Sequence, residues 1–252
     1  MFASGEAEPK IAEQSAVTLA AAIRARTLSA REVINAHIEV LERVNPAVNA
    51  VVVARYDAAR READRADALV ASTPTAELPP LLGVPITVKE SVAVAGLPNT
   101  AGVVARRAIN ATQNATVVQR LADAGAIVLG LTNTSEACMW TETRNRVYGR
   151  TNNAYDHRRS AGGSSGGEGA AIGSGATPIG LGTDTLGSIR IPALCNGVFG
   201  HRPSTGLVPL TGSWPPPYGV AKMCVNGPLA RRAEDLMPVL RIMAGPDGID
   251  PL

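Results

Sequence analysis

Glycine and serine concentrate in one stretch of this sequence, and the stretch contains residue types that covalent chemistry would need. Residues 160–203 include the run GGSSGG at 162–167 and the run DTLGS at 184–188, which opens a predicted helix. Glycine lets the backbone approach a ligand closely. The first N–H groups of a helix have no partner within it and attract negative charge. A Gly–Ser turn at a helix start therefore offers the geometry of an oxyanion hole.

A serine hydroxyl in this stretch would need a base before it could act as a nucleophile. His157 lies in a charged segment and His201 stands next to Arg202, so neither is placed as that base. A lysine can serve if its pKa falls by about 3 units, which burial and nearby positive charge can produce. Lys89 is the best candidate because it ends an apolar run. On position alone, a lysine at a strand end more often reaches solvent.

The glycine–serine run is open to other interpretations. Segments of this composition commonly form flexible linkers or turns, although the strand-like residues that follow closely disfavour a linker here. A phosphate-binding loop is a further alternative, but the GxxxxGK[ST] pattern is absent. The residues alone therefore support tight packing and an active site about equally.

The segments that would position these groups alternate between helix and strand. Apolar, β-branched runs predict strands at 83–90, 127–131 and 177–183, and the first of them carries Lys89. Helices are predicted at 112–124 and 233–244, with an irregular polar segment at 142–157 and a rigid loop at 214–217. This alternation favours an α/β fold built on one sheet.

The first part of the chain is predicted to be mainly helical. Ser29 followed by Glu32 fits a capping box, and the helix that follows is expected to end near Asn45–Pro46. The other predicted elements here are helices at 17–25 and 54–71, a short strand at 48–53 and a linker at 72–80. We therefore expect an N-terminal helical segment, residues 1–76, that packs on a core formed by residues 77–252.

Composition narrows the class of protein. The net charge of +2 among 252 residues, with no basic cluster, disfavours a nucleic-acid partner. Three cysteines without a CxxC spacing indicate a reducing compartment. The N-terminus is charged, and no apolar run approaches the roughly 20 residues that span a bilayer. The three scattered histidines form no metal-ligand pattern. A cytoplasmic protein without a membrane-spanning segment, metal or cofactor is expected.

Three separated motifs together resemble the amidase signature family. They are the lysine-bearing strand at 83–89, GGSSGGEG at 162–169, and GTD at 182–184 followed by GSIRIP at 187–192. Their order and the spacing of Ser164 and Ser188 match the family, and the resemblance extends over residues 15–245. The segments at 199–203 and 226–229 favour its fatty-acid-amide-hydrolase-like branch. The glutaminase subunit of the tRNA-dependent amidotransferase is less similar, because it usually has glutamine where this chain has Ile191.

The resemblance implies a Ser–Ser–Lys triad that hydrolyses a small-molecule amide. Ser188 would attack the amide carbonyl and carry the acyl group. Ser164, which the family holds in a cis peptide with Gly163, would relay the proton to Lys89. Lys89 would be the neutral base that later returns the proton to the leaving amine.

The family pattern also implies supporting roles. The backbone N–H groups of Thr185, Leu186, Gly187 and Ser188 would form the oxyanion hole, although many relatives have glycine at the position of Leu186. Ser165 would hold the glycine loop by hydrogen bonds, and Asp184 and Arg190 would brace the turn. The family places a pocket-wall residue at the position of Cys138, for which a small buried thiol is the alternative interpretation. Ile191 is also assigned to substrate binding, because its apolar side chain is compatible with an aliphatic or acyl substrate.

The fold that the resemblance implies is α/β, with a mixed β-sheet core flanked by helices. Family domains are much longer than 252 residues, so the sheet is expected to be incomplete, with an exposed strand edge. A homodimer or a complementing C-terminal chain would complete it. The alternative to an amide hydrolase is a truncated, inactive fragment or scaffold subunit that retains the motif. A phosphate-binding α/β module is a third interpretation.

Overall fold

The central feature of the computed structural model, which describes residues 10–216 and 222–251, is a six-stranded sheet in the order β1-β3-β2-β6-β8-β7. Strand β2 runs parallel to β3 and β6, whereas β1 and β8 run antiparallel to their neighbours. The expected mixed sheet is confirmed. Its strands are β1 (Val51–Ala54), β2 (Pro85–Lys89), β3 (Ile127–Thr132), β6 (Ile179–Asp184), β7 (Phe199–Gly200) and β8 (Val225–Ala230).

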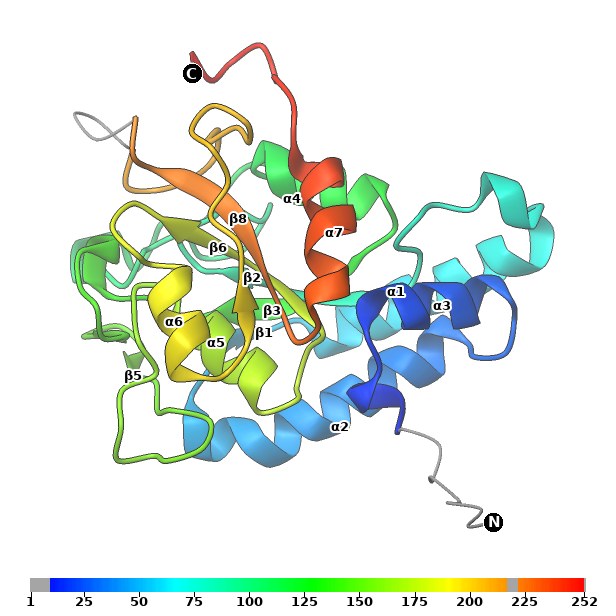
Figure 1. Ribbon diagram of the computed structural model, residues 1–252, viewed down its shortest axis with the longest axis horizontal. Helices are drawn as coiled ribbons and strands as arrows, with labels where there is room; N and C mark the ends of the chain where they lie inside the picture. Colours follow the sequence, from blue (N-terminus) through cyan, green and yellow to red (C-terminus); the bar gives the residue numbers. More distant parts are fainter. Residues whose placement is uncertain (1–9, 217–221, 252) are drawn as a thin grey trace, which may run out of the picture.

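Helices cover both faces of this sheet (Figure 1). Helices α4 and α7 pack on the face that carries Ile86 and Val88 of β2, while α5 packs on the opposite face. Because successive side chains of a strand point to opposite faces, Thr87 and Lys89 point toward α5. The helices are α1 (Ala16–Arg24), α2 (Ala30–Val48), α3 (Tyr56–Ser72), α4 (Thr116–Asp123), α5 (Gly166–Gly173), α6 (Arg190–Cys195) and α7 (Leu236–Met243).

Strand β8 is an element that the sequence patterns did not reveal. It pairs with β6 over six residues and with β7 over two, although it contains Asn226, Gly227 and Pro228. Asn–Gly–Pro is typical of turns, and proline is rare in a strand that is paired on both sides. Pro228 fits because it takes part in pairing as an acceptor: its carbonyl accepts a hydrogen bond from the His201 N–H. This bond does not require the backbone N–H that proline lacks.

Helix α2 begins as predicted but ends later. The capping box between Ser29 and Glu32 is confirmed. The predicted end near Asn45–Pro46 is wrong, because the helix continues through Pro46 to Val48 and closes at Asn49 in the left-handed conformation, with φ of 50°. Proline in the last turn removes a single hydrogen bond at a point where the helix is about to end, and its fixed φ suits the helix.

The three N-terminal helices share one buried apolar cluster with β3. Leu19 of α1, Ile34 of α2 and Ala63 of α3 belong to the same cluster as Leu129. Helix α1 is also held from the far end of the sequence, because the Asp235 carboxylate accepts hydrogen bonds from the N–H groups of Ala16 and Val17 at 3.0 Å each. The helical segment therefore packs on the sheet, while its boundary at residue 76 stays a prediction.

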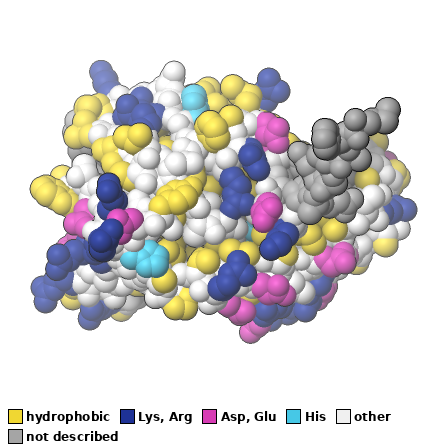
Figure 2. All heavy atoms as spheres, turned by 60° about the horizontal axis from the view of Figure 1, so that its bottom comes forward, with side chains coloured by type: hydrophobic (Ala, Val, Ile, Leu, Met, Phe, Trp, Pro, Cys, Tyr) yellow, Lys and Arg dark blue, Asp and Glu magenta, His cyan; other side chains and the backbone are white. Residues whose placement is uncertain are grey.

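Charged side chains of both signs cover the outer face of this helical layer. Figure 2 shows basic and acidic side chains interspersed over the face that includes α2. Ion pairs form between α2 and α3 and within α3, such as Arg31 with Asp64 at 2.7 Å and Arg60 with Asp57 at 3.1 Å. No helix within residues 10–216 and 222–251 is both long enough and apolar enough to span a membrane.

The remaining segments differ from their predicted bounds by a few residues. Helix α4 starts at Thr116 rather than at 112, and α7 is preceded by a short 3₁₀ turn, Ala233–Asp235. The irregular segment at 142–157 contains a small hairpin of β4 (Arg144–Asn145) and β5 (Gly149–Arg150). The predicted proline loop is described from Trp214 to Pro216, and Pro217 lies outside the described residues.

His37 is a buried histidine on α2 that should make the fold sensitive to acid. Its Nδ1 lies 3.1 Å from the Ala176 carbonyl, and its Nε2 has no partner among the described residues. Burial lowers the pKa of His37 to about 4. The unfolded chain, with an ordinary histidine pKa, therefore binds a proton between about pH 6.5 and pH 4 that the folded protein excludes. Stability from this group is present above pH 6.5 and is lost as the pH falls.

We predict that His37→Leu removes this part of the acid sensitivity. Between pH 7 and pH 5 the free energy of unfolding of the wild type should fall by about 2 kcal/mol more than that of the variant. Urea denaturation at the two pH values measures the difference. The exposed His157, changed to Gln, is the control and should behave as the wild type does. An equal loss of stability in wild type and His37→Leu would contradict the assignment.

Candidate active site

A cavity of about 360 Å³ opens beside the ends of β2 and β6, where the candidate residues converge. Ser164, Thr183 and Ser188 supply hydroxyl groups to its wall. Most of the remaining lining is apolar or sulfur-containing: Ala137, Cys138, Met139, Trp140, Leu186, Trp214, Pro215, Pro216 and Cys224. Parallel strands β2 and β6 both end here, which is where α/β sheets commonly bind their ligands.

Lys89 has no contact with solvent and lies behind two residues that line this cavity, Ser164 and Thr183. Its Nζ is 2.6 Å from the Ser164 Oγ and 2.7 Å from the Thr183 Oγ1. Burial lowers the pKa of Lys89 below its ordinary value, while Cys138, Cys224 and Asp184 act in the opposite direction. The amine therefore does not reach solvent as strand-end lysines commonly do, and its environment favours the neutral form that a base requires.

The glycine–serine run forms a tightly packed turn that leads into α5. The peptide bond between Gly163 and Ser164 is cis, as the resemblance implied. Thr143 fixes the turn from outside, since its hydroxyl donates to the Gly162 carbonyl at 2.9 Å and accepts from the Gly166 N–H at 2.9 Å. A Cβ on Gly162 would lie 2.9 Å from the backbone of Pro192. This packing excludes a flexible linker.

Ser165 and Asp184 hold the glycine turn and the DTLGS turn together. The Ser165 N–H donates to the Ser188 carbonyl at 3.2 Å, and its hydroxyl donates to the Thr183 carbonyl at 3.2 Å. The Asp184 carboxylate accepts from the Gly187 N–H at 2.7 Å and from the Arg190 guanidinium at 3.0 Å. Both residues therefore position backbone, as the family pattern implied, and Asp184 is engaged on its own loop.

The DTLGS turn presents N–H groups beside the cavity. Among the described residues, the N–H groups of Thr185, Leu186 and Ser188 have no hydrogen-bond partner, whereas the Gly187 N–H is taken by Asp184. The Leu186 side chain is exposed at the rim. Unpaired N–H groups at a helix start are suited to a developing negative charge.

The structure brings the predicted site residues together to different degrees. Lys89 and Ser164 are hydrogen-bonded, and Ser188 lines the same cavity, but its hydroxyl makes no hydrogen bond to Ser164. Cys138 lines the cavity, and its contact with substrate stays a prediction. Ile191 is not part of the described lining, because its side chain packs against Gly187 behind the turn.

Several lining residues had no signal in the sequence. Thr183, the second hydrogen-bond partner of Lys89, comes from β6, and Cys224 comes from the segment before β8. Trp140 and Trp214 lie far apart in the chain but line the same cavity. Their convergence depends on strand order, which local sequence does not reveal.

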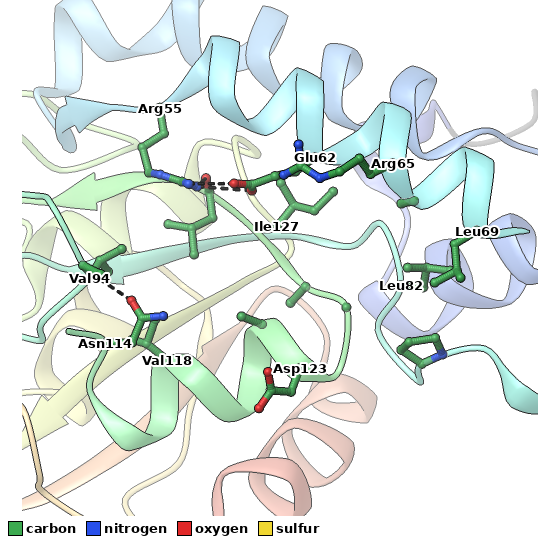
Figure 3. A pocket seen from close by; sticks show the side chains of 17 residues that line it. Arg55, Glu62, Arg65, Leu69, Leu82, Val94, Asn114, Val118, Asp123 and Ile127 are labelled. Carbon is green, nitrogen blue, oxygen red and sulfur yellow. Dashed lines mark hydrogen bonds and ion pairs between the residues drawn. The ribbon is translucent and has the colours of Figure 1, made fainter.

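A second cavity, of about 480 Å³, lies between α3, α4 and the adjoining end of β3 (Figure 3). Its charged groups include the pair Arg55 and Glu62, joined at 2.7 Å, and the side chains of Arg65 and Asp123. None of its described lining residues carries a hydroxyl, thiol, imidazole or lysine amine. Groups that could perform nucleophilic chemistry gather at the first cavity, which is therefore the candidate active site.

Comparison with known proteins identifies the family of this chain. A family model described as Amidase matches residues 32–251. The chain belongs to the amidase family. It is 48% identical over 240 residues to fatty-acid amide hydrolase 2-A of Danio rerio and 45% identical over 238 residues to fatty-acid amide hydrolase 2 of Homo sapiens. Each alignment covers 92% of this chain and 45% of the relative.

Solved amidase structures share the fold. The native peptide amidase from Stenotrophomonas maltophilia superimposes with a TM-score of 0.88 at 32% identity, covering 95% of this chain and 49% of that protein. The chain spans about half the length of the curated relatives it matches. The mixed sheet with flanking helices described above is therefore the amidase signature fold over that half.

We predict that Lys89→Met in this amidase chain folds with a melting temperature at or above that of the wild type at pH 7. A buried amine costs stability at neutral pH, since the unfolded chain binds a proton there that the folded state disfavours. The advantage of methionine should shrink as the pH rises toward 10, where the lysine of the unfolded chain also loses its proton. Thermal denaturation against pH measures it, with the exposed Lys222→Met as the control. A lower melting temperature at every pH would show that the amine stabilises the fold.

Proposed function

We propose that this chain carries the acyl-transfer residues of an amide hydrolase, with Ser188 as nucleophile, Ser164 as proton relay and Lys89 as base. The observation that carries the proposal is the fully buried Lys89 amine, hydrogen-bonded at 2.6 Å to a serine in a cavity that also contains Ser188. Membership of the amidase family supports the same reaction class. The relatives named fatty-acid amide hydrolase are about twice as long, so the activity of the whole protein is part of the proposal.

In the first half of the reaction, the Ser188 Oγ attacks the carbonyl carbon of the amide. Its proton passes to the Ser164 Oγ while the Ser164 proton passes to the Lys89 Nζ. The tetrahedral intermediate then collapses, the C–N bond breaks, and the leaving amine receives the proton back from Lys89 through Ser164. The product is an acyl ester on Ser188, and water attacks this ester by the same proton path to release the carboxylic acid.

The negative charge on the tetrahedral oxygen would be held by backbone N–H groups of the DTLGS turn. Thr185, Leu186 and Ser188 are the donors we propose, because the Gly187 N–H is directed at Asp184 at 2.7 Å. Asp184 fixes the turn by accepting from the Gly187 and Ile189 N–H groups and from Arg190, which keeps the donors in place before substrate binds. Such preorganised donors are commonly the largest contribution to catalysis of acyl transfer.

The Ser188 and Ser164 hydroxyl groups are not hydrogen-bonded to each other in the structure. We propose that this hydrogen bond forms when substrate binds. Catalytic hydrogen bonds are often long in free enzymes and tighten in the complex with substrate. The Ser188 hydroxyl is half-buried and unpaired among the described residues, so it can turn toward Ser164 without breaking another hydrogen bond. The Lys89–Ser164 link is already formed at 2.6 Å.

We further propose that the substrate carries an apolar acyl group. The cavity wall beyond the hydroxyl groups is formed by the aromatic side chains of Trp140 and Trp214 and by Met139, Leu186 and Pro215. Burying an aliphatic chain against such a wall contributes about 0.8 kcal/mol for each CH₂ group.

The expectation that a homodimer or a complementing C-terminal chain completes the sheet stays a prediction.

Labelling with a fluorophosphonate tests the nucleophile. The Ser188 Oγ would form a bond to phosphorus as fluoride leaves, and peptide mapping should find the adduct on Ser188 alone. Ser188→Ala should abolish labelling and lower amide hydrolysis by about 10³-fold or more, since it removes the hydroxyl that we propose carries the acyl ester. Ser174→Ala, at the end of α5 and outside the cavity, is the control. An adduct on another residue would refute the assignment.

Removing the base should have a comparable effect on rate with little effect on folding. For Lys89→Ala we predict a labelling rate constant about 10²- to 10⁴-fold lower than that of the wild type, which is the usual contribution of general base catalysis. Circular dichroism and the melting curve verify that the variant is folded. Labelling at the wild-type rate in a folded Lys89→Ala protein would eliminate Lys89 as the base.

A further inference from the structure

A buried carboxyl group lies next to the proposed catalytic residues and has no part in the reaction described above. Glu168, on the first turn of α5, has no solvent contact. Its Oε2 accepts a hydrogen bond from the Thr87 hydroxyl of β2 at 2.6 Å, and its Oε1 accepts one from the Thr132 hydroxyl of β3 at 2.7 Å. A Cβ on Gly180 of β6 would overlap the same carboxyl group. One side chain therefore contacts the three central strands.

These contacts lie immediately beside Lys89. Thr87 precedes Lys89 by two positions, so both side chains point to the α5 face of β2. Thr132 is the residue that pairs with Lys89 in the register of β2 and β3. Ser164 lies in the turn that leads into α5, four positions before Glu168. The strand that carries the base and the helix whose leading turn carries its serine partner are thus joined through one carboxyl group.

We propose that Glu168 is a positioning residue for Lys89, which holds the base against Ser164 and whose charge sets how readily the base accepts a proton. The proposal rests on the function proposed above for Lys89. The geometry supplies the first part, because the carboxyl group ties β2 and β3 to α5 at the level of the amine. The second part follows from the low polarity of the surroundings, in which a nearby charge acts strongly.

The titratable groups that face Lys89 come from four segments. Asp184 from the end of β6, Cys138 from the turn Glu136–Cys138 and Cys224 from the segment before β8 each act to raise the pKa of Lys89. Glu168 from α5 is the fourth, and its coupling to Lys89 is seen in the pKa of its own carboxyl group. Lys89 is in turn the charged group that acts on Glu168.

Glu168 is the member of this set that is placed to change charge near neutral pH. Burial raises the pKa of Glu168 to about 7, although the two threonine hydroxyls and Lys89 act to lower it. Burial also acts to raise the pKa of Asp184, but hydrogen bonds from Arg190 and from backbone N–H groups outweigh it, so this carboxylate stays ionised. Burial raises the pKa of the Cys224 thiol and keeps it neutral.

The direction of the effect on the base follows from the sign of the charge. An ionised Glu168 stabilises the ammonium form of Lys89 and so raises its pKa, whereas a neutral group at this position lowers it. Activation of Ser188 needs the neutral amine, so its rate rises with pH as Lys89 loses its proton. This rise is the ascending limb of the rate–pH profile. A residue at position 168 that is neutral at all pH values should therefore shift the ascending limb to lower pH.

Glu168→Gln tests this with nearly unchanged shape. Its amide oxygen can accept from one threonine, and its amide NH₂ can donate to the other threonine hydroxyl, so both hydrogen bonds can be kept. We expect the ascending limb of the fluorophosphonate labelling rate to move down by about one pH unit. Asp235→Asn is the matched control, because Asp235 is also a fully buried carboxyl group but caps α1. Asp235→Asn should lower the stability of the fold and leave the ascending limb of the labelling rate at the same pH.

A second measurement does not depend on activity. Because the folded protein holds the Glu168 proton more tightly than the unfolded chain does, this group contributes stability below about pH 4.5 that is lost as the pH rises through about 7. The wild type should therefore lose more stability than Glu168→Gln between pH 5 and pH 8. Glu168→Leu, which removes both hydrogen bonds, should label slowly at every pH.

The outcomes separate the two proposals. If Lys89→Ala labels at the wild-type rate, the proposed function fails and the inference fails with it. If Lys89→Ala is inactive but the limb of Glu168→Gln does not move, the inference alone is overturned. Equal limb shifts in Glu168→Gln and Asp235→Asn would also overturn it, because the effect would then come from any buried carboxyl group.

Discussion

The burial of one amine is the constraint on which the rest of the site depends. A charged ammonium without solvent contact is costly in the interior of a protein, so Lys89 must be neutral, or closely partnered, or both. The structure supplies partners from the glycine turn and from β6, at 2.6 and 2.7 Å. The side chain is long and flexible in principle, but strand β2 fixes its origin and the two hydroxyls fix its end.

Small residues allow these partners to approach. In the glycine turn and the first turn of α5, the space of a side chain is already occupied by other parts of the protein: Thr143 lies against Gly166, and the backbone of Asn133 lies against Gly167. The turn is thus fixed by close packing against its neighbours as well as by hydrogen bonds. Helix α5 can then lie close enough to the sheet for Glu168 to reach the hydroxyls of two strands. The same close packing therefore determines both the position of the Lys89 partners and the burial of the Glu168 carboxyl group.

Much of this arrangement could be anticipated from the sequence, because some signals are local. The apolar run around Lys89, the capping box of α2 and the two serine-bearing turns each depend on neighbouring residues, and the family resemblance supplied their order. Strand β8 could not be anticipated, since Asn–Gly–Pro locally favours a turn and only pairing with β6 makes it a strand. The burial of Lys89 was equally hidden, because Thr183, Cys138 and Cys224 come from segments that meet only in the folded chain. In both cases tertiary contacts, and not the preferences of the local sequence, determined the structure.

The cap of helix α1 has a consequence for the order in which the chain can fold during its synthesis. A ribosome releases the N-terminus first, yet the carboxylate that accepts from the Ala16 and Val17 N–H groups belongs to Asp235. Until that residue has emerged, the first turn of α1 has only Ser15 to satisfy its N–H groups. The N-terminal cap of α1 is therefore completed only after Asp235 has left the exit tunnel, whereas the apolar face of α1 can pack earlier against α2, α3 and β3.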